Sequence, residues 1–142
     1  MNTQNYQTAS ILLVEDDDVD AKGIERALRK LKIANPLIRA RDGIEALELL
    51  EDKVVEKPYI ILLDLNMPRM NGIEFLEYVR KRSSLSTSVI FVLTTSKSDE
   101  DKYLAYKQHI AGYIVKENLD TGFDALTQLL DHYWRIVELP LK

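Results

Sequence analysis

The sequence predicts an α/β protein in which a doubly wound parallel sheet of five strands is flanked by five helices. Three observations predict this class. Short aliphatic runs alternate along the chain with longer stretches whose apolar residues recur every three or four positions. The clearest run, Tyr59–Leu63, is apolar at every position, as a strand covered on both faces should be. No repeat or linker divides the 142 residues, so the alternation belongs to a single domain.

The chain opens with a polar, unpatterned segment, and residues 1–9 are expected to form a flexible tail. The run Ile11–Val14 is too short for a helix and rich in β-forming residues, which predicts a buried strand. Between Val19 and Leu31 the apolar residues share one stripe opposite the charged ones, which predicts an amphipathic helix. Asn35-Pro36 breaks that pattern, and a weaker strand follows over Leu37–Ala40.

The middle of the chain repeats the alternation. Gly43 opens a second helix, and the strand Tyr59–Leu63 follows it. Asn71-Gly72 starts a third helix, after which Val89–Leu93 forms a fourth buried strand.

The last third of the chain predicts the remaining elements. A polar helix is expected from about Ser98 to Gln108, a short strand over Gly112–Val115, and a strongly amphipathic helix from about Thr121 to Val137. Residues 138–142 are expected to be a C-terminal tail, which leaves residues 10–137 as the folded domain.

Composition excludes several functions. Nineteen basic and 23 acidic residues give a net charge of −4, so no positive field favours nucleic acid. The absence of cysteine excludes disulfides, thiolate metal sites and a cysteine nucleophile. No apolar run approaches the ~20 residues of a membrane span, and the polar N-terminus is unlike a signal peptide. A cytoplasmic protein is therefore expected.

Polar side chains follow four of the five predicted strands at the point where each strand ends, namely Glu15–Asp18, Asp64, Thr94–Ser96 and Lys116. Ligands bind beyond the carboxyl ends of such strands, so these groups should share one crevice. Acidic residues before a helix also serve as N-caps. Clustered carboxylates nevertheless suit Mg²⁺, and a carboxylate beside the metal can attack phosphorus. A lysine and a threonine hydroxyl would then stabilise the transferred phosphoryl group.

Four segments together resemble the receiver domain of two-component response regulators, and the resemblance runs from about Ser10 to Val137. It rests on Ile11-Leu-Leu-Val-Glu15-Asp16-Asp17, Asp64-Leu-Asn66-Met67-Pro68-Arg-Met70-Asn-Gly72, Leu93-Thr94-Thr95 and Gly112-Tyr113-Ile-Val-Lys116. The resemblance implies a flavodoxin-like fold with strand order 2-1-3-4-5.

The resemblance also implies a metal-assisted phosphorylation site. Asp64 corresponds to the phosphoacceptor, which takes a phosphoryl group from a histidine kinase. Mg²⁺ would be bound by Asp64, by Asp16 directly, by Glu15 through water and by the main-chain carbonyl of Asn66. The pair Asp16-Asp17 is also open, and Glu15-Asp16 is preferred because the family's acidic pair follows the strand directly.

Further roles follow from the same resemblance. Thr94 corresponds to the hydroxyl residue that turns toward the phosphate, Lys116 to the phosphate's ion-pair partner, and Tyr113 to the aromatic switch residue. Asn66 and Ser96 occupy the positions that tune phosphoryl lifetime. One departure is that Glu117 replaces the proline that commonly follows the lysine. Because a cis Lys116–Glu117 bond would cost ~2.5–4 kcal/mol, a trans peptide is expected there.

The implied partners are proteins. No output domain is expected after the receiver, so we predict a stand-alone regulator that binds a sensor histidine kinase and a downstream target or phosphotransfer protein, and neither nucleic acid nor membrane. Glu51–Tyr59 and residues 133–140 are similar to single-domain regulators of bacteriophytochrome kinases. Such proteins often dimerise through the fourth helix, fifth strand and fifth helix, where Tyr103, Tyr106 and Tyr113 are expected.

Other functions fit the residues less well. Phosphohydrolases of the haloacid dehalogenase type need a second acid two residues after the nucleophile, where this chain has Asn66. The five glycines form no phosphate-binding loop of a nucleotide-binding protein. A phosphorelay intermediate and an unphosphorylated pseudo-receiver stay open as alternatives, and no activity as an enzyme is expected.

Overall fold

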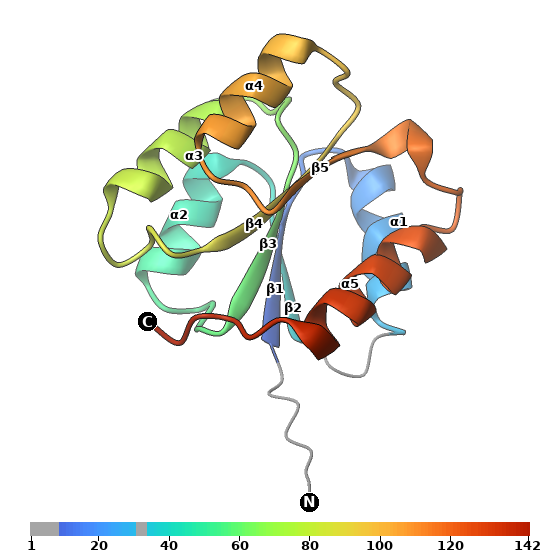
Figure 1. Ribbon diagram of the computed structural model, residues 1–142, viewed down its shortest axis with the longest axis horizontal. Coiled ribbons are helices and arrows are strands. Elements are labelled where there is room, and N and C mark those ends of the chain that lie inside the picture. Colours follow the sequence, from blue (N-terminus) through green and yellow to red (C-terminus); the bar gives the residue numbers. More distant parts are fainter. Residues whose placement is uncertain (1–8, 31–33) are drawn as a thin grey trace, which may run out of the picture.

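The computed structural model describes residues 9–30 and 34–142, which form one parallel sheet with helices on both faces (Figure 1). The strands lie in the order β2-β1-β3-β4-β5, as predicted. The strands are β1 (Ala9–Val14), β2 (Ala34–Ala40), β3 (Tyr59–Leu63), β4 (Val89–Thr94) and β5 (Gly112–Val115). The helices are α1 (Asp18–Leu28), α2 (Gly43–Glu51), α3 (Gly72–Lys81), α4 (Asp99–Lys107), the short 3₁₀ helix η1 (Lys116–Asn118) and α5 (Asp124–Ile136).

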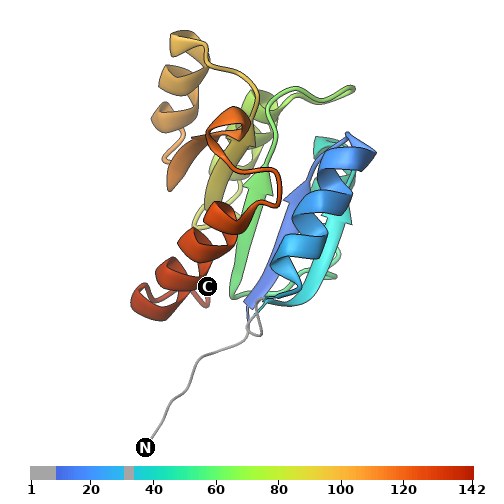
Figure 2. The ribbon, with the colours of Figure 1, turned by 90° about the vertical axis from the view of Figure 1, so that its right-hand side faces the viewer.

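The sheet separates two hydrophobic cores. Helices α2, α3 and α4 cover one face, and α1 and α5 lie side by side over the other (Figure 2). Successive side chains of a strand point to opposite faces, so Leu12 and Val14 enter the first core while Ile11 and Leu13 enter the second. This double burial is why the central strands contain apolar residues at consecutive positions.

The register aligns the carboxyl ends of the central strands. Val14 pairs with Leu63 on β3 and with Ala40 on β2. The next residues extend this ladder, because the Glu15 N–H donates to the Ala40 carbonyl (3.0 Å) and the Asp64 N–H donates to the Val14 carbonyl (3.0 Å). The first polar residues after β1 and β3 are thereby held at the same edge of the sheet.

In the amino-terminal part of the chain, several strand and helix ends differ from the prediction. β1 begins at Ala9, so this residue belongs to the sheet and not to the tail predicted over residues 1–9, while residues 1–8 lie outside the described part of the chain. β2 begins at Ala34, three residues before the predicted start at Leu37, and so includes Pro36; β2 is an edge strand, where a missing N–H is tolerated. α1 ends at Leu28, and the predicted helical residue Leu31 lies outside the described residues.

The last helix begins three residues later than predicted. Phe123, the residue before α5, has a left-handed backbone conformation (φ 58°), so the helix begins only after it. The Asp120 carboxylate accepts hydrogen bonds from the Asp124 and Ala125 N–H groups (3.0 Å each) and so satisfies the first donors of α5. α5 is 13 residues long, and none of the helices in the described ranges is long and apolar enough to cross a membrane.

Candidate phosphorylation and metal site

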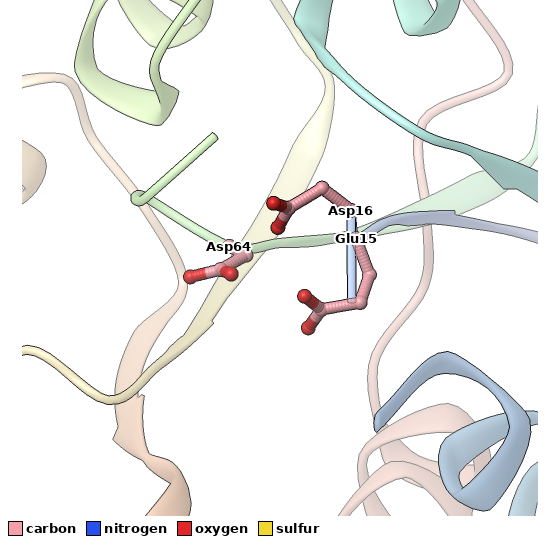
Figure 3. Close-up of side chains that lie close together, drawn as sticks. All are labelled: Glu15, Asp16 and Asp64. Carbon is pink, nitrogen blue, oxygen red and sulfur yellow. The ribbon is translucent and has the colours of Figure 1, made fainter. Parts of the chain in front are cut away.

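The acidic loop after β1 divides its side chains between two tasks. Asp17 is the N-cap of α1, and its Oδ1 accepts from the Val19 N–H (2.8 Å) and the Asp20 N–H (3.2 Å). Glu15 and Asp16 are turned toward Asp64 instead, and one carboxylate oxygen of each of these three residues lies within 4.8 Å of the others (Figure 3). The geometry thus groups Asp64 with Glu15 and Asp16, while Asp17 is engaged by the helix.

The cluster has the chemistry of a site for a hard divalent cation. Glu15 and Asp64 are buried and Asp16 is exposed, so the group opens to solvent on the side of Asp16. Carboxylate oxygens this close repel one another unless a cation lies among them. An oxygen-only donor set with an open side suits an ion that keeps part of its water shell.

The predicted lysine is at the same edge. Lys116 Nζ lies 2.6 Å from Glu15 Oε1, 2.8 Å from Asp20 Oδ2 and 3.8 Å from Asp64 Oδ2. Its side chain is 10% exposed. The ammonium therefore hydrogen-bonds to Glu15 and Asp20 and reaches Asp64 only as a longer ion pair.

Burial shifts the pKa of both partners in the closest pair. Burial of the Glu15 carboxyl raises its pKa to about 7. The negative charge of Asp64 also raises this pKa, whereas the hydrogen bond from Lys116 lowers it. Burial alone would lower the pKa of Lys116, but the hydrogen bonds to Asp20 and Glu15 and the charge of Asp64 raise it. The lysine is thus charged throughout the physiological range.

The residues predicted to switch lie on neighbouring strands, Thr94 at the carboxyl end of β4 and Tyr113 within β5. Thr94 is fully buried, and its hydroxyl oxygen accepts from the Ser96 N–H (3.3 Å). The Tyr113 hydroxyl donates to the Ser96 carbonyl oxygen (3.0 Å), and the Ser96 hydroxyl donates to Asp101 Oδ2 (2.6 Å). The loop after β4 is therefore tied to both β5 and α4.

The loop after β3 places Asn66 beside the carboxylates. The Asn66 N–H donates to Asp64 Oδ1 (3.3 Å). An open depression of about 380 Å³ lies here and extends to α4; it is lined by Asp16, Leu65, Asn66, Met67, Pro68, Asn71, Ile73 and Asp101. Gly72 is required by close packing, because a Cβ there would lie 2.7 Å from Leu65 Cα and 2.8 Å from the Asp64 carbonyl oxygen.

The departure after Lys116 is accommodated locally. Among the described residues the one cis peptide bond precedes Pro58, so the Lys116–Glu117 peptide is trans, as expected. Residues 116–118 form η1, and the Glu117 carboxylate pairs with Lys97 from the loop after β4. The loops that follow β4 and β5 are thus joined by an ion pair.

Two residues at this edge were missed from the sequence. Arg39 on β2 donates from Nε (3.0 Å) and Nη2 (2.8 Å) to the Glu15 carbonyl oxygen and from Nη1 to Asp18 (2.8 Å). Asp20 holds Lys116 from the first turn of α1. An acid in a helix's first turn is typical of capping and dipole stabilisation, and an arginine in a strand carries no signal, so neither stood out.

These features together define a flavodoxin-like α/β protein with a cluster of carboxylates at the carboxyl edge of its sheet whose oxygen atoms could bind a cation. The family model of the response regulator receiver domain matches residues 11–130, and the chain belongs to this family.

Relatives support the same assignment over almost the whole chain. The response regulator Rcp1 from Synechocystis is 30% identical over 145 aligned positions, which cover 99% of each chain. The Mn²⁺-bound form of response regulator Rcp1 superposes with a TM-score of 0.83 at 32% identity, covering 93% of this chain and 99% of that one. The phosphorylated cyanobacterial phytochrome response regulator RcpA gives a TM-score of 0.79 at 30% identity, with 93% and 98% covered. The predicted fold, sheet order and receiver family are confirmed, and these relatives do not favour the alternatives of a relay intermediate or a pseudo-receiver.

Proposed function

We propose that this receiver takes a phosphoryl group on Asp64 from a histidine kinase, with Mg²⁺ bound by the acidic cluster, and thereby changes its interactions with other proteins. The observation that carries the proposal is the convergence of Glu15, Asp16 and Asp64 within 4.8 Å, with the Lys116 ammonium 3.8 Å from Asp64. The site would act as a signalling switch rather than turn over a separate substrate.

The proposed chemistry is a phosphoryl transfer between two side chains. An oxygen of the Asp64 carboxylate attacks phosphorus, the phosphorus–nitrogen bond to the kinase's histidine breaks, and its electron pair returns to that nitrogen. Mg²⁺, held by Asp16, Asp64 and the Asn66 carbonyl and through water by Glu15, would neutralise charge on the phosphoryl oxygens. Lys116 would stabilise the negative charge of the product.

The switch would act through Thr94 and Tyr113. A phosphoryl group on Asp64 would attract the Thr94 hydroxyl, which now accepts from the Ser96 N–H. Tyr113 would then move inward and break its hydrogen bond to the Ser96 carbonyl, which shifts the loop that leads into α4. Asn66 and Ser96 would tune the phosphoryl lifetime from their positions beside the site.

Intact-mass spectrometry tests the proposal directly. Wild-type protein incubated with Mg²⁺ and acetyl phosphate should gain one phosphoryl group. Asp64→Ala, and wild type without Mg²⁺, should gain none. Replacing Mg²⁺ with Ca²⁺ tests the preference for a small octahedral ion, which predicts less adduct. Wild type that binds no Mg²⁺ and forms no adduct even from a kinase would overturn the proposal.

The partners can be proposed more finely. Because RcpA is a phytochrome response regulator, we propose a phytochrome-type histidine kinase as the phosphoryl donor. We also propose the cytoplasm as the place of action. Tyr103 and Tyr106 on α4 are 65% and 52% exposed, which supports a homodimer through α4, β5 and α5. Light scattering of wild type and Tyr106→Glu, with and without phosphorylation, should show a dimer that this variant loses.

A further inference from the structure

The Lys116 ammonium is held on the side of α1, away from the predicted phosphoacceptor. Two of its three N–H donors are engaged by Glu15 (2.6 Å) and Asp20 (2.8 Å). The distance to Asp64 Oδ2 is 3.8 Å, which is longer than a hydrogen bond. Asp20 thus contributes a carboxylate that competes with Asp64 for the same cation.

Asp20 is fixed in this position by the start of α1. Its N–H donates to the capping carboxylate of Asp17 (3.2 Å), and its own carboxylate accepts from Lys116 Nζ (2.8 Å). Its side chain is 33% exposed. Asp18 in the same helical turn is instead paired with Arg39 (2.8 Å) and Arg41 (3.0 Å). Two acids of one turn therefore serve different cations.

We infer that Asp20 is a positioning residue that holds the Lys116 ammonium back from Asp64 in the unphosphorylated protein and so weakens, through that lysine, the binding of a phosphoryl group. This inference rests on the proposed function of Asp64. A phosphoryl group on Asp64 must draw the ammonium from its place between Glu15 and Asp20. Neutralising Asp20 removes one of the two competing carboxylates, so the lysine becomes freer to pair with the phosphoryl oxygens.

Beryllofluoride, which mimics a phosphoryl group on a carboxylate, is a suitable probe for a titration in saturating Mg²⁺. Asp20→Asn should bind beryllofluoride about fivefold more tightly than wild type. Asp18→Asn removes the same charge from the same turn but has no contact with Lys116, and its affinity should stay near the wild-type value. Circular dichroism checks folding, and Asp20→Ala is the second variant should Asp20→Asn fold poorly.

A double-mutant cycle separates action through Lys116 from direct repulsion between Asp20 and the phosphoryl group. In a Lys116→Gln background, the Asp20→Asn change should leave the residual affinity unaltered. If Asp20→Asn still bound beryllofluoride more tightly in the Lys116→Gln background, the inference would be overturned, because Asp20 would then act on the ligand directly. Equal affinity of wild type and Asp20→Asn also overturns it. Failure of wild type itself to bind beryllofluoride would instead count against the proposed function.

A spectroscopic readout in Mg²⁺-free protein needs no ligand. The Lys116 ammonium is nearly buried and hydrogen-bonded, so its ¹⁵N–¹H NMR signal should be protected from solvent exchange and should vanish in Lys116→Gln. Asp20→Asn should shift this signal and increase its exchange rate, whereas Asp18→Asn should do neither. An unchanged signal in Asp20→Asn would show that Asp20 does not position the lysine.

Discussion

Arg69 and Asp42 join the loop that follows β3 to the start of α2. Arg69 Nε and Nη2 lie 2.7 and 2.6 Å from Asp42 Oδ2. Asp42 is buried and is also the N-cap of α2, where its Oδ1 accepts from the Glu45 N–H (2.9 Å). Arg69 follows Pro68 in the segment that connects Asp64 to α3, so the pair ties this segment to the start of α2.

Asp42→Asn should destabilise the protein by about 1–2 kcal/mol at neutral pH. Asparagine caps a helix as well as aspartate does, so the loss measures the pairing with Arg69. Burial alone would raise the pKa of Asp42, but hydrogen bonds from the Glu45 N–H and from Arg69 hold it below 3.8. The contribution of the carboxylate is therefore present above pH 3.8 and is lost as the pH falls through the lower pKa of the folded state.

Urea denaturation of wild type, Asp42→Asn and Arg69→Gln at several pH values measures this contribution. The gap between wild type and Asp42→Asn should narrow below pH 3.8. If Arg69→Gln were as stable as wild type while Asp42→Asn was not, the loss in Asp42→Asn would not come from the pairing with Arg69.

Gly72→Ala should damage both stability and the site. The added methyl would lie 2.7 Å from Leu65 Cα and 2.8 Å from the Asp64 carbonyl oxygen, so main chain next to Asp64 must move. Overpacking of this kind costs about 1–3 kcal/mol. Gly122→Ala is the matched control, because its nearest neighbour is 3.7 Å away. Thermal melting should separate the two variants, and Gly72→Ala should also take up less phosphoryl group from acetyl phosphate.

Stability in Mg²⁺-free buffer should fall between about pH 4.5 and pH 7. Burial raises the pKa of Glu15 from 4.5 to about 7, so in this window the folded state binds a proton that the unfolded state has released. The contribution is fully present below pH 4.5 and is lost as the pH rises through 7; it amounts to about 3 kcal/mol.

Chemical denaturation across this window tests the assignment to Glu15. Glu15→Gln should remove most of the slope, whereas Glu48→Gln, at an exposed position on α2, should keep the wild-type profile. Added Mg²⁺ should stabilise wild type most at high pH, where Glu15 is ionised. A slope that survives in Glu15→Gln would assign the titration to another group.

The buried strands and the polar residues at the edge of the sheet could be predicted from the sequence, because each follows from a pattern of neighbouring residues. Tyr59–Leu63 is apolar throughout because cores lie on both of its faces, and the polar residues that follow β1, β3, β4 and β5 meet because parallel strands end at one edge. Asp20 and Arg39 could not be assigned in this way. Asp20 joins α1 to η1, and Arg39 joins β2 to the loop after β1. Both contacts link segments far apart in the sequence and depend on side-chain direction in the folded chain.

The start of α5 shows the same limit at the level of secondary structure. The apolar periodicity extends back to Phe123, which led to a predicted start near Thr121. The helix instead begins where the Asp120 carboxylate can accept from the first N–H groups, and that capping interaction has no hydrophobic signature.

Arg39→Gln should weaken Mg²⁺ binding and lower stability by about 1–3 kcal/mol. The arginine donates two hydrogen bonds to the Glu15 carbonyl oxygen and one to Asp18, so its loss frees the loop that places Glu15 and Asp16. Arg41→Gln is the control, because Arg41 shares Asp18 but is largely exposed and makes no bond to Glu15. Calorimetric Mg²⁺ titration and urea denaturation should show the larger loss for Arg39→Gln. Equal losses of Mg²⁺ affinity and stability in the two variants would mean that the ion pairs with Asp18, rather than the hydrogen bonds to the Glu15 carbonyl oxygen, order the acidic loop.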